Sequence, residues 1–239
     1  MISSDYVTLG GGKFYIDVYK DGKPSGKFEY FGLTTAPTIS TDVETLEHIN
    51  TEGATQAVDK TIVKKQSATL NFTSDEISMQ MLSRAFYGEV GQSETSISKS
   101  ISGGVSKGDI VDLGVFGGSC EIDGLNENED FTYNAKGGFV EFLKDISDDI
   151  EISVSGGASN DFVSAFKTSK LEASLMFIGE SATGSRIKAD FYKCSIRQNG
   201  EFALKGDDWL SVSFTADVLK DESRSVGDQF FKITLLENK

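Results

Sequence analysis

The chain has 239 residues, of which 38 % are hydrophobic and 25 % are charged, and its formal net charge is −14. This composition is typical of a globular protein with one all-β domain or two small domains, and the acidity argues against sequence-specific nucleic-acid binding, which requires a basic face. Two cysteines are too few for the disulfide framework of a secreted protein, and no apolar run approaches the ~20 residues of a membrane helix.

An alternation of apolar and polar residues dominates the sequence and predicts half-buried β-strands. It is clearest in Trp209–Leu219, whose predicted buried face consists of Leu210, Val212, Phe214, Ala216 and Val218. In chain order, the predicted strands are Phe14–Val18, Phe28–Phe31, Thr38–Ile49, Val58–Phe72, Ser96–Ile101, Asp109–Val115, Cys120–Asp123, Phe139–Leu143, Ile150–Val154, Lys170–Phe177, Arg186–Ile196, Trp209–Leu219 and Gln229–Leu236. We therefore expect an all-β, mainly antiparallel fold.

Glycine-containing turns separate many of these strands. They are Asp21-Gly22, Gly117-Gly118, Lys136-Gly137-Gly138, Gly156-Gly157 and Asn199-Gly200. The last of these predicts a hairpin between the strand 186–196 and the apolar segment Phe202–Leu204.

One short flanking helix is predicted after residue 73. Thr73 and Glu76 have the spacing of a capping box, and Gly88 is a suitable stop. Between them, the apolar residues at helical spacing are Ile77, Met81, Leu82, Ala85 and Phe86. Asp161–Phe166 is a second and shorter helical candidate.

Two predicted strands, Thr38–Ile49 and Val58–Phe72, are longer than the usual ~5–6 residues and flank the polar stretch Asn50–Ala57. Paired, they would form a hairpin that projects beyond a compact domain. On the second strand, strict alternation gives one face the residues Val58, Ile62, Ala68, Leu70 and Phe72, interrupted by Lys60 and Lys64. A strand of this kind suits pairing with a neighbouring subunit.

The sequence has few candidates for catalysis or metal binding. His48 is the only histidine and has no local nucleophile signature, and one histidine with two distant cysteines cannot supply a familiar zinc site. Cys120 and Cys194 are expected to be buried thiols, although the sequence does not exclude a disulfide between them.

The remaining motifs are weak. Asn126, Asn128 and Asp130 alternate as calcium ligands do, but the required glycine is replaced by Phe131. Gly10-Gly11-Gly12-Lys13 lacks the spacing of a phosphate loop. Carboxylate pairs such as Asp148-Asp149 could serve a glycosidase, but scattered acids usually form a solvated face. We therefore expect no enzyme, no cofactor and no metal.

The first third of the chain resembles the tail tube (major tail) proteins of long-tailed bacteriophages. The resemblance covers roughly residues 8–90 and rests on the order and spacing of several segments. These are Gly10–Asp17 (GGGKFYID), Tyr30-Phe31-Gly32, Glu44–Gly53 (ETLEHINTEG), Val58-Asp59-Lys60 and the segment LNFTSDEIS that begins at Leu70. Residues 91–239 agree only in being rich in predicted strands.

The resemblance implies a single domain over residues 1–239, a β-sandwich or barrel with a long projecting hairpin and a family-specific insertion around residues 100–165. It also implies a virion protein, made in the host bacterial cytoplasm, that assembles into six-subunit rings and a stacked tube. The acidic tube would conduct double-stranded DNA without binding it. The implied partners are further copies of the chain and the tail-tip initiator, tape-measure and terminator proteins. The expected subunit and ring interface consists of Asn50, Thr51, Glu52, Gly53, Ala54, Thr55, Gln56, Lys60, Lys64 and Lys65.

Three alternatives remain open from the sequence. A contractile-tail tube or an injection-system ring would share the fold. A β-sandwich adhesin or carbohydrate-binding module would be a monomer with an exposed aromatic platform, to which Tyr15, Tyr19, Tyr30 and Phe31 could contribute. An acid/base glycosidase has no positive signal in the sequence.

Overall fold

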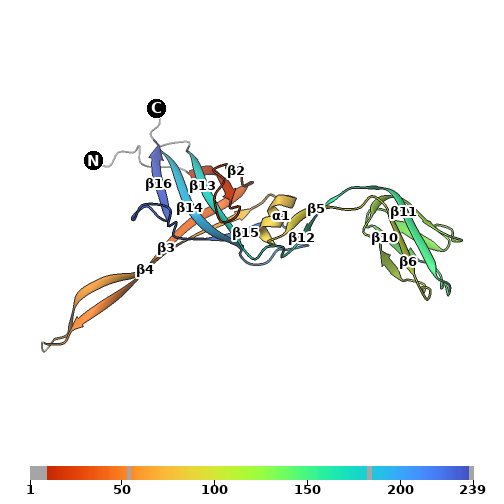
Figure 1. Cartoon of the computed structure of the whole chain (residues 1–239), viewed down its shortest axis with the longest axis horizontal. Helices are drawn as coiled ribbons and strands as arrows, with labels where there is room; N and C mark the ends of the chain where they lie inside the picture. Colours follow the sequence, from red (N-terminus) through yellow and green to blue (C-terminus); the bar gives the residue numbers. More distant parts are fainter. Residues whose placement is uncertain (1–9, 53–54, 182–184, 237–239) are drawn as a thin grey trace. The chain divides into compact units, whose positions relative to one another are not determined.

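The structure, a computed structural model, describes residues 10–52, 55–181 and 185–236. The chain forms two compact units: residues 1–88 and 165–239 belong to unit 1, and residues 89–164 to unit 2. All ladders between strands are antiparallel, and the described residues contain one short α-helix (Figure 1). This confirms the predicted fold class.

Unit 1 is built on one eight-stranded sheet. Its strands are β1 (Gly10–Val18), β2 (Glu29–Tyr30), β3 (Thr34–Asn50), β4 (Ala57–Ser74), β13 (Leu171–Ser181), β14 (Arg186–Gln198), β15 (Val212–Val218) and β16 (Phe231–Leu236). Seven of them follow the order β2-β1-β13-β14-β15-β4-β3, and β16 also pairs with β14. The two end strands, β2 and β3, do not pair with each other, so this sheet is not closed into a barrel.

Strand β14 carries two partners along the same edge. Its first half, from Arg186 to Phe191, pairs with β16, and its last five residues, from Cys194 to Gln198, pair with β15. A register shift opposite β13 lies between these halves, and such bulges bend a strand. The sheet therefore divides at the middle of β14.

Aromatic side chains fill the core of unit 1. Phe72 stacks against Phe14 and Phe214, with ring centroids 5.3 and 5.5 Å apart, and Phe31 meets Phe72 edge-on at 5.0 Å. These four rings are fully buried. The predicted alternation is confirmed from Val212 to Val218, whose four apolar residues are buried, but Leu210, predicted on the same face, is exposed and precedes β15.

Unit 2 has its own core between two small sheets. One sheet has the order β7-β10-β9 and the other β6-β11-β8, while β5 and β12 form a separate ribbon. The bounds are β5 (Glu89–Gln92), β6 (Ile97–Ile101), β7 (Ile110–Asp112), β8 (Phe116–Ile122), β9 (Phe131–Asn134), β10 (Phe139–Phe142), β11 (Ile150–Ala158) and β12 (Asp161–Ser164). Phe142 from one sheet and Ile152 from the other belong to one buried cluster, so unit 2 is a small β-sandwich.

The division into units bears on the expected single domain with an insertion. Unit 2 begins at Glu89 and ends at Ser164, and these two residues are cross-strand partners in the β5–β12 ribbon. The stretch proposed as an insertion, around residues 100–165, lies almost entirely within unit 2.

The helix is confirmed, but its predicted cap is wrong. Helix α1 (Met79–Ala85) begins after Ser78, whose side chain accepts a hydrogen bond from the backbone N–H of Met81. Thr73 instead belongs to β4, where it pairs with Ser213 of β15 and Thr35 of β3. The sheet hydrogen bonds on both sides of β4 therefore override the local capping signal.

Several turn predictions also fail. Gly117-Gly118 and Gly156-Gly157 lie inside the paired strands β8 and β11, where positive-φ glycines form irregularities in the ladder instead of turns. The predicted hairpin partner Phe202–Leu204 is not a strand, because β14 pairs across a longer loop with β15. Asp161–Phe166 contains strand β12 and a turn, not a helix.

Candidate assembly interface

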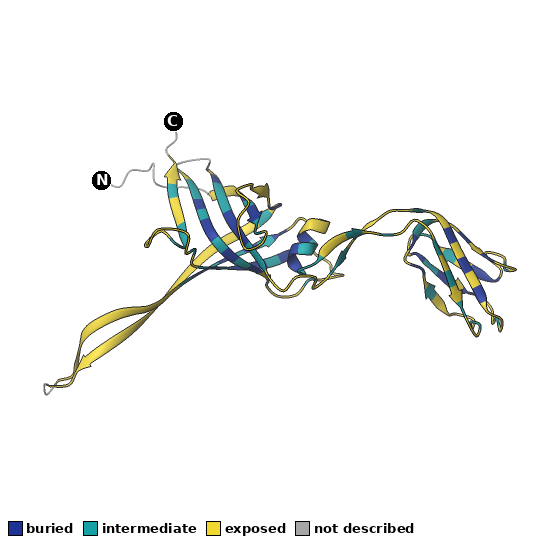
Figure 2. Cartoon of the chain, viewed as in Figure 1, coloured by how far each residue is buried: buried dark blue, intermediate teal, exposed yellow. Residues whose placement is uncertain are grey.

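The long hairpin predicted from the sequence is formed by β3 and β4. Their ladder runs from the pair Thr34↔Ser74 to the pair Asn50↔Ala57, and the hairpin extends away from the body of unit 1 (Figure 1). Every residue of β4 from Ala57 to Gln66 is exposed, and so is nearly all of β3 (Figure 2). The outer hairpin therefore has no core of its own within unit 1.

Two β-bulges in β4 change which side chains share a face. The partner of Glu44 is Lys65 and that of Thr45 is Val63, so Lys64 is an extra residue. In the same way, His48 pairs with Lys60 and Ile49 with Val58, which leaves Asp59 extra. Each extra residue reverses the alternation beyond it.

The hairpin consequently has two chemically different faces, because directly paired residues lie on the same side of an antiparallel ladder. We define the apolar face by Ile39, Thr41, Val43, Thr45, Glu47 and Ile49 of β3 and Val58, Thr61, Val63 and Gln66 of β4. It continues the core side of the sheet, since Ile39 and Thr41 pair with the buried Leu70 and Ala68.

The opposite side is the charged face, defined by Asp42, Glu44, Leu46 and His48 of β3 and Asp59, Lys60, Ile62, Lys64 and Lys65 of β4. The predicted common face for Val58 and Ile62 is therefore wrong. Strict alternation fails because the two bulges insert Lys64 and Asp59.

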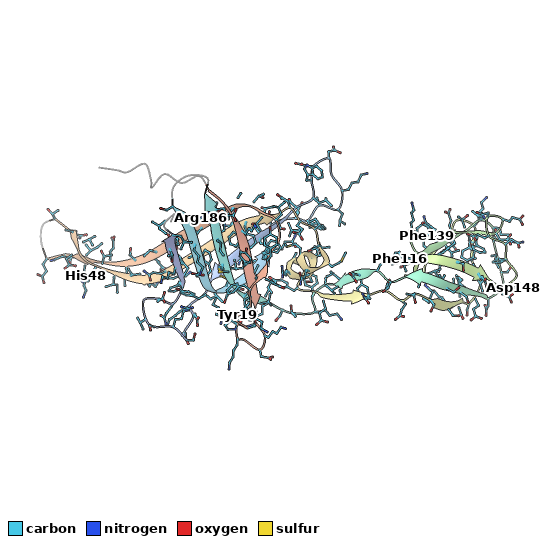
Figure 3. The ribbon with its side chains drawn as sticks, turned by 90° about the horizontal axis from the view of Figure 1, so that it is seen from above. Tyr19, His48, Phe116, Phe139, Asp148 and Arg186 are labelled. Atoms are coloured by element: carbon cyan, nitrogen blue, oxygen red, sulfur yellow. The ribbon has the colours of Figure 1, made fainter. Side chains whose placement is uncertain are left out.

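One ion pair and one histidine–carboxylate hydrogen bond connect the two strands on the charged face. The Lys64 Nζ lies 2.9 Å from Glu44 Oε1, and His48 Nδ1 lies 2.6 Å from Asp59 Oδ1. All four side chains are largely exposed, so such pairs contribute about 0–1 kcal/mol each. Figure 3 shows His48 on the projecting hairpin, away from Tyr19 and Arg186 in the body of unit 1.

The residues expected at an interface lie at the tip and on the charged face. Asn50 ends β3 and its Oδ1 accepts a hydrogen bond from the backbone N–H of Glu52, at 2.9 Å. Gly53 and Ala54 lie outside the described residues, and the exposed tip residues on either side are Thr51, Glu52, Thr55 and Gln56. Lys60 and Lys65 stand opposite His48 and Glu44.

The apolar face was missed from the sequence. Val43, Ile49 and Val63 are each at least half exposed in the single chain, although they have the composition of a buried strand. No sequence signal marks the two bulges, and without them Val63 falls on the same side as Lys65.

The acidic charge of the chain is concentrated in unit 2. Residues 89–164 contain 15 acidic and 4 basic residues, which accounts for −11 of the net charge of −14. The hairpin from Thr34 to Ser74 holds 5 acidic residues and 3 lysines. The total charge therefore does not describe the hairpin.

The other sequence motifs are occupied by structural contacts. Asp130 accepts a hydrogen bond from the Asn126 backbone N–H and forms an ion pair with Lys144. Both contacts lower the pKa of the Asp130 carboxyl, and the contact with Lys144 has the larger effect. Cys120 and Cys194 are free and lie in the cores of different units. Gly10–Lys13 begins strand β1.

The residues that the structure describes contain neither a metal-binding cluster nor a membrane-spanning helix. Among them, no group of three or more His, Cys, Asp or Glu side chains is arranged to hold a metal ion. Helix α1 is far too short to cross a bilayer, and no other helix with sufficient length and hydrophobicity occurs in those residues.

By its fold the chain is an antiparallel all-β protein with two units, and unit 1 carries a projecting hairpin with two chemically different faces. Residues 7–234 match the family described as "Protein of unknown function UCP028589", and the chain belongs to this family. No curated protein matches the sequence.

Proposed function

We propose that the protein is a structural subunit that assembles with copies of itself into rings and a tube, as a tail tube protein of a long-tailed bacteriophage does. One observation carries the proposal: the apolar face of the hairpin is exposed in the single chain. Its five aliphatic residues are Ile39, Val43, Ile49, Val58 and Val63. An exposed apolar surface of this kind, interrupted here only by the pair Glu47 and Thr61, favours an interaction site.

The sheet edge supports assembly through strands. Strand β3 is the last strand of its sheet, so one edge of a 17-residue strand carries backbone N–H and C=O groups that have no strand partner in the single chain and are available to a strand of another copy. Natural proteins usually cover or interrupt an edge this long. Pairing β3 with a strand of the next subunit would close a ring without a free edge, as a β-barrel does.

The two faces then have different roles. In a ring, which we propose to contain six copies, the apolar face packs against neighbouring subunits and the charged face lines the conduit. Lys60, Lys64 and Lys65, which were expected from the sequence at the subunit interface, would then line the conduit instead. The charged face mixes three acids, Asp42, Glu44 and Asp59, with three lysines, Lys60, Lys64 and Lys65. The wall proposed here would therefore be only weakly charged, and not acidic as expected from the total charge of the chain. Double-stranded DNA would pass along it without a strongly basic surface to hold it.

The test compares two adjacent residues of similar exposure on opposite faces. Val63 on the apolar face is 56 % exposed and Ile62 on the charged face is 50 % exposed. The variants Val63→Glu and Ile62→Glu are examined by negative-stain electron microscopy and sedimentation velocity over a concentration series.

We expect rings or tubes from the wild type and from Ile62→Glu, and only monomers from Val63→Glu, because burying an unpaired carboxylate in an apolar interface is costly. Deletion of residues 50–57 should also prevent assembly if the tip contacts a neighbour. A wild type that stays monomeric at every concentration, or equal assembly of both variants, would contradict the proposal.

A carbohydrate-binding module is the second candidate, and one feature of unit 2 favours it. A pocket of about 650 Å³ combines the aromatic side chains of Phe116 and Phe162 with the polar side chains of Gln92, Asn160 and Asp161. Sugars bind to such combinations of ring faces and hydrogen-bonding groups. Glycan-array binding that Phe162→Ala abolishes, by a protein that remains monomeric, would support this function instead.

A further inference from the structure

Asn199 and Gly200 lie where the chain leaves strand β14. Asn199 is the only asparagine of the chain that a glycine follows. Both residues are exposed, and they come directly after Gln198, the last residue of β14. The hairpin predicted at this pair does not form, and the loop that the pair begins reaches β15 only at Val212. Solvent therefore has access to both residues.

The backbone N–H of Gly200 has no hydrogen-bond acceptor among the residues that the structure describes. The Asn199 N–H, by contrast, donates a hydrogen bond to the Ser213 carbonyl oxygen, at 2.8 Å. A Cβ atom built on Gly200 would meet no heavy atom within 4 Å, and glycine has no side chain that could shield its own nitrogen. The nitrogen of Gly200 is thus both unpaired and sterically open.

The side-chain amide of Asn199 also has no hydrogen bond in the described part of the chain. Four other asparagine amides are held by hydrogen bonds, from Asn50 to the Glu52 N–H, from Asn71 to the Thr215 hydroxyl, from Asn134 to the Gly137 N–H and from Asn160 to the Ala158 carbonyl oxygen. Asn126 and Asn128 are exposed as well, but a glutamate follows each of them. Asn199 therefore combines a free amide with an open neighbouring nitrogen.

We propose that Asn199 is a site of spontaneous modification, at which the chain converts asparagine to aspartate and isoaspartate through a cyclic imide. The Gly200 nitrogen gives its proton to solvent and bonds to the side-chain carbonyl carbon of Asn199, and ammonia leaves with the amide nitrogen. The product is a five-membered succinimide ring. Closing the ring is intramolecular, so its rate depends on how readily the two groups reach each other.

Water then opens the ring at one of its two carbonyl carbons. Attack at the side-chain carbon restores the normal backbone and leaves an aspartate. Attack at the main-chain carbon leaves an isoaspartate, whose backbone continues through the former side chain. No group is oxidised or reduced in either step, and water is the only co-reactant.

The sheets protect other asparagines from this reaction. Phe72, which follows Asn71, is paired with Phe214 in the β4–β15 ladder, and Asp161, which follows Asn160, is paired with Gln92 in the β5–β12 ribbon. Ring closure requires the backbone to rotate, which would break these ladders. The loop after Gln198 has no ladder to break.

The modification would change the loop and leave the sheet intact. It adds a negative charge next to Glu201, and isoaspartate also lengthens the main chain shortly before Phe202. The Phe202 ring packs edge-on against Phe86, with centroids 5.8 Å apart. This ring attaches the loop to the body, since Leu204 and Trp209 are 88 % and 92 % exposed.

The test follows the full-length protein during incubation at pH 8 and at pH 5. Trypsin cleaves after Arg197 and Lys205 and releases a peptide in which Asn199 is the only asparagine. Mass spectrometry measures its conversion, and methylation by an isoaspartyl methyltransferase detects the isoaspartate form. Asn126 and Asn128 are the internal controls, because they are exposed but lack a following glycine.

We expect Asn199 to convert faster than Asn126 and Asn128 by more than about tenfold, and faster at pH 8 than at pH 5, because base removes the proton from the Gly200 nitrogen. Gly200→Ala should slow the conversion by a similar factor, since its methyl group crowds that nitrogen. Its φ of +88° strains alanine, but the space around it is open, and circular dichroism checks that the fold is kept. Asn199→Gln should not convert, because its longer side chain would have to close a larger ring.

Three results would overturn the inference. They are conversion of Asn199 no faster than that of Asn126 and Asn128, an unchanged rate in Gly200→Ala, and conversion that occurs only after the protein is unfolded in urea. The inference concerns a reaction within one chain and does not rest on self-assembly. Its failure would leave the proposed tube untouched, and a protein that never assembles could still modify Asn199.

Discussion

Arg84 of α1 forms an ion pair with Glu29 of β2 and lies over the ring of Phe31, 5.3 Å from its centroid. The Arg84 side chain is only 7 % exposed, and burial lowers the pKa of its guanidinium while the Glu29 carboxylate raises it. One arginine thus joins the helix to the first strands of the sheet. Its main partner is the half-exposed Glu29, and Glu76 and the Phe31 carbonyl oxygen contribute less.

Removing that partner should destabilise unit 1. Glu29→Gln keeps the shape of the side chain but removes the main compensation of the buried Arg84 charge, which we expect to lower the free energy of unfolding by about 2 kcal/mol. Urea denaturation measures this, with Glu201→Gln in an exposed loop as the control. Equal stabilities of the two variants would mean that water compensates Arg84.

A second prediction concerns two glycines of unit 2, Gly118 in strand β8 and Gly124 in the turn after it. Gly118 has φ +72° and a Cβ atom there would lie 2.2 Å from the Ser155 carbonyl oxygen, whereas Gly124 has φ +73° with open space around it. Gly124→Ala should cost about 1 kcal/mol for its backbone conformation, and Gly118→Ala at least about 2 kcal/mol more for the steric conflict. Thermal unfolding of both variants checks this, and similar costs would show that β11 can move aside.

The sequence predicted a strand correctly where one side of that strand is buried in a core. Val212–Val218 and Ile150–Val154 alternate because one side faces a core, and a period of two follows directly from that. The pairing of two long strands was also predictable from their length and the polar stretch between them. Short strands such as β12 were missed because they bury little, and their residues show no period.

Register and strand partners could not be predicted. The bulges at Lys64 and Asp59 have no composition signal, yet they determine which face of the hairpin is apolar. Asn199-Gly200 has ideal turn chemistry, but β14 pairs instead with the more distant β15. Non-local hydrogen bonds and core packing outweigh a local turn preference in such cases. The exposed Trp209 was predicted within a strand because its neighbours alternate.

Unit 2 should fold on its own. It has separate sheets and a separate core, and its ends meet because Glu89 and Ser164 are cross-strand partners, with Cα atoms about 5 Å apart. We expect a fragment of residues 89–164 to give a β-type circular dichroism spectrum and cooperative unfolding.

The complementary variant replaces residues 89–164 by a short Gly-Ser linker. Unit 1 should retain its fold, and under the proposed function it should retain ring assembly, since the hairpin is unchanged. A fragment without cooperative unfolding, or loss of the unit 1 fold in the linker variant, would show that the two units depend on each other for stability.

The buried thiol of Cys194 should make stability fall at alkaline pH. Burial, with a smaller contribution from Asp217, raises the pKa of this fully buried thiol from 9.0 to about 12. The unfolded chain releases the proton above pH 9 while the folded chain keeps it, so the stabilisation is complete below pH 9 and decreases between pH 9 and 12, by at most about 1.4 kcal/mol per pH unit. Cys120, with a pKa raised to about 11, and the tyrosines with raised pKa values act in the same direction.

Urea denaturation at a series of pH values from 8 to 11 measures this dependence in the wild type and in Cys194→Ala. At pH 8 the variant should be less stable by about 1 kcal/mol, because it leaves a small cavity. Its stability should then decline less steeply than that of the wild type, so that the two curves approach each other as the pH rises. Cys120→Ala is the matched control. Because the pKa of the Cys120 thiol is raised only to about 11, this variant should change the slope of stability against pH only up to about pH 11. Parallel curves for the wild type and Cys194→Ala would mean that the thiolate is solvated in the folded protein, which contradicts the complete burial of Cys194 in the core of unit 1.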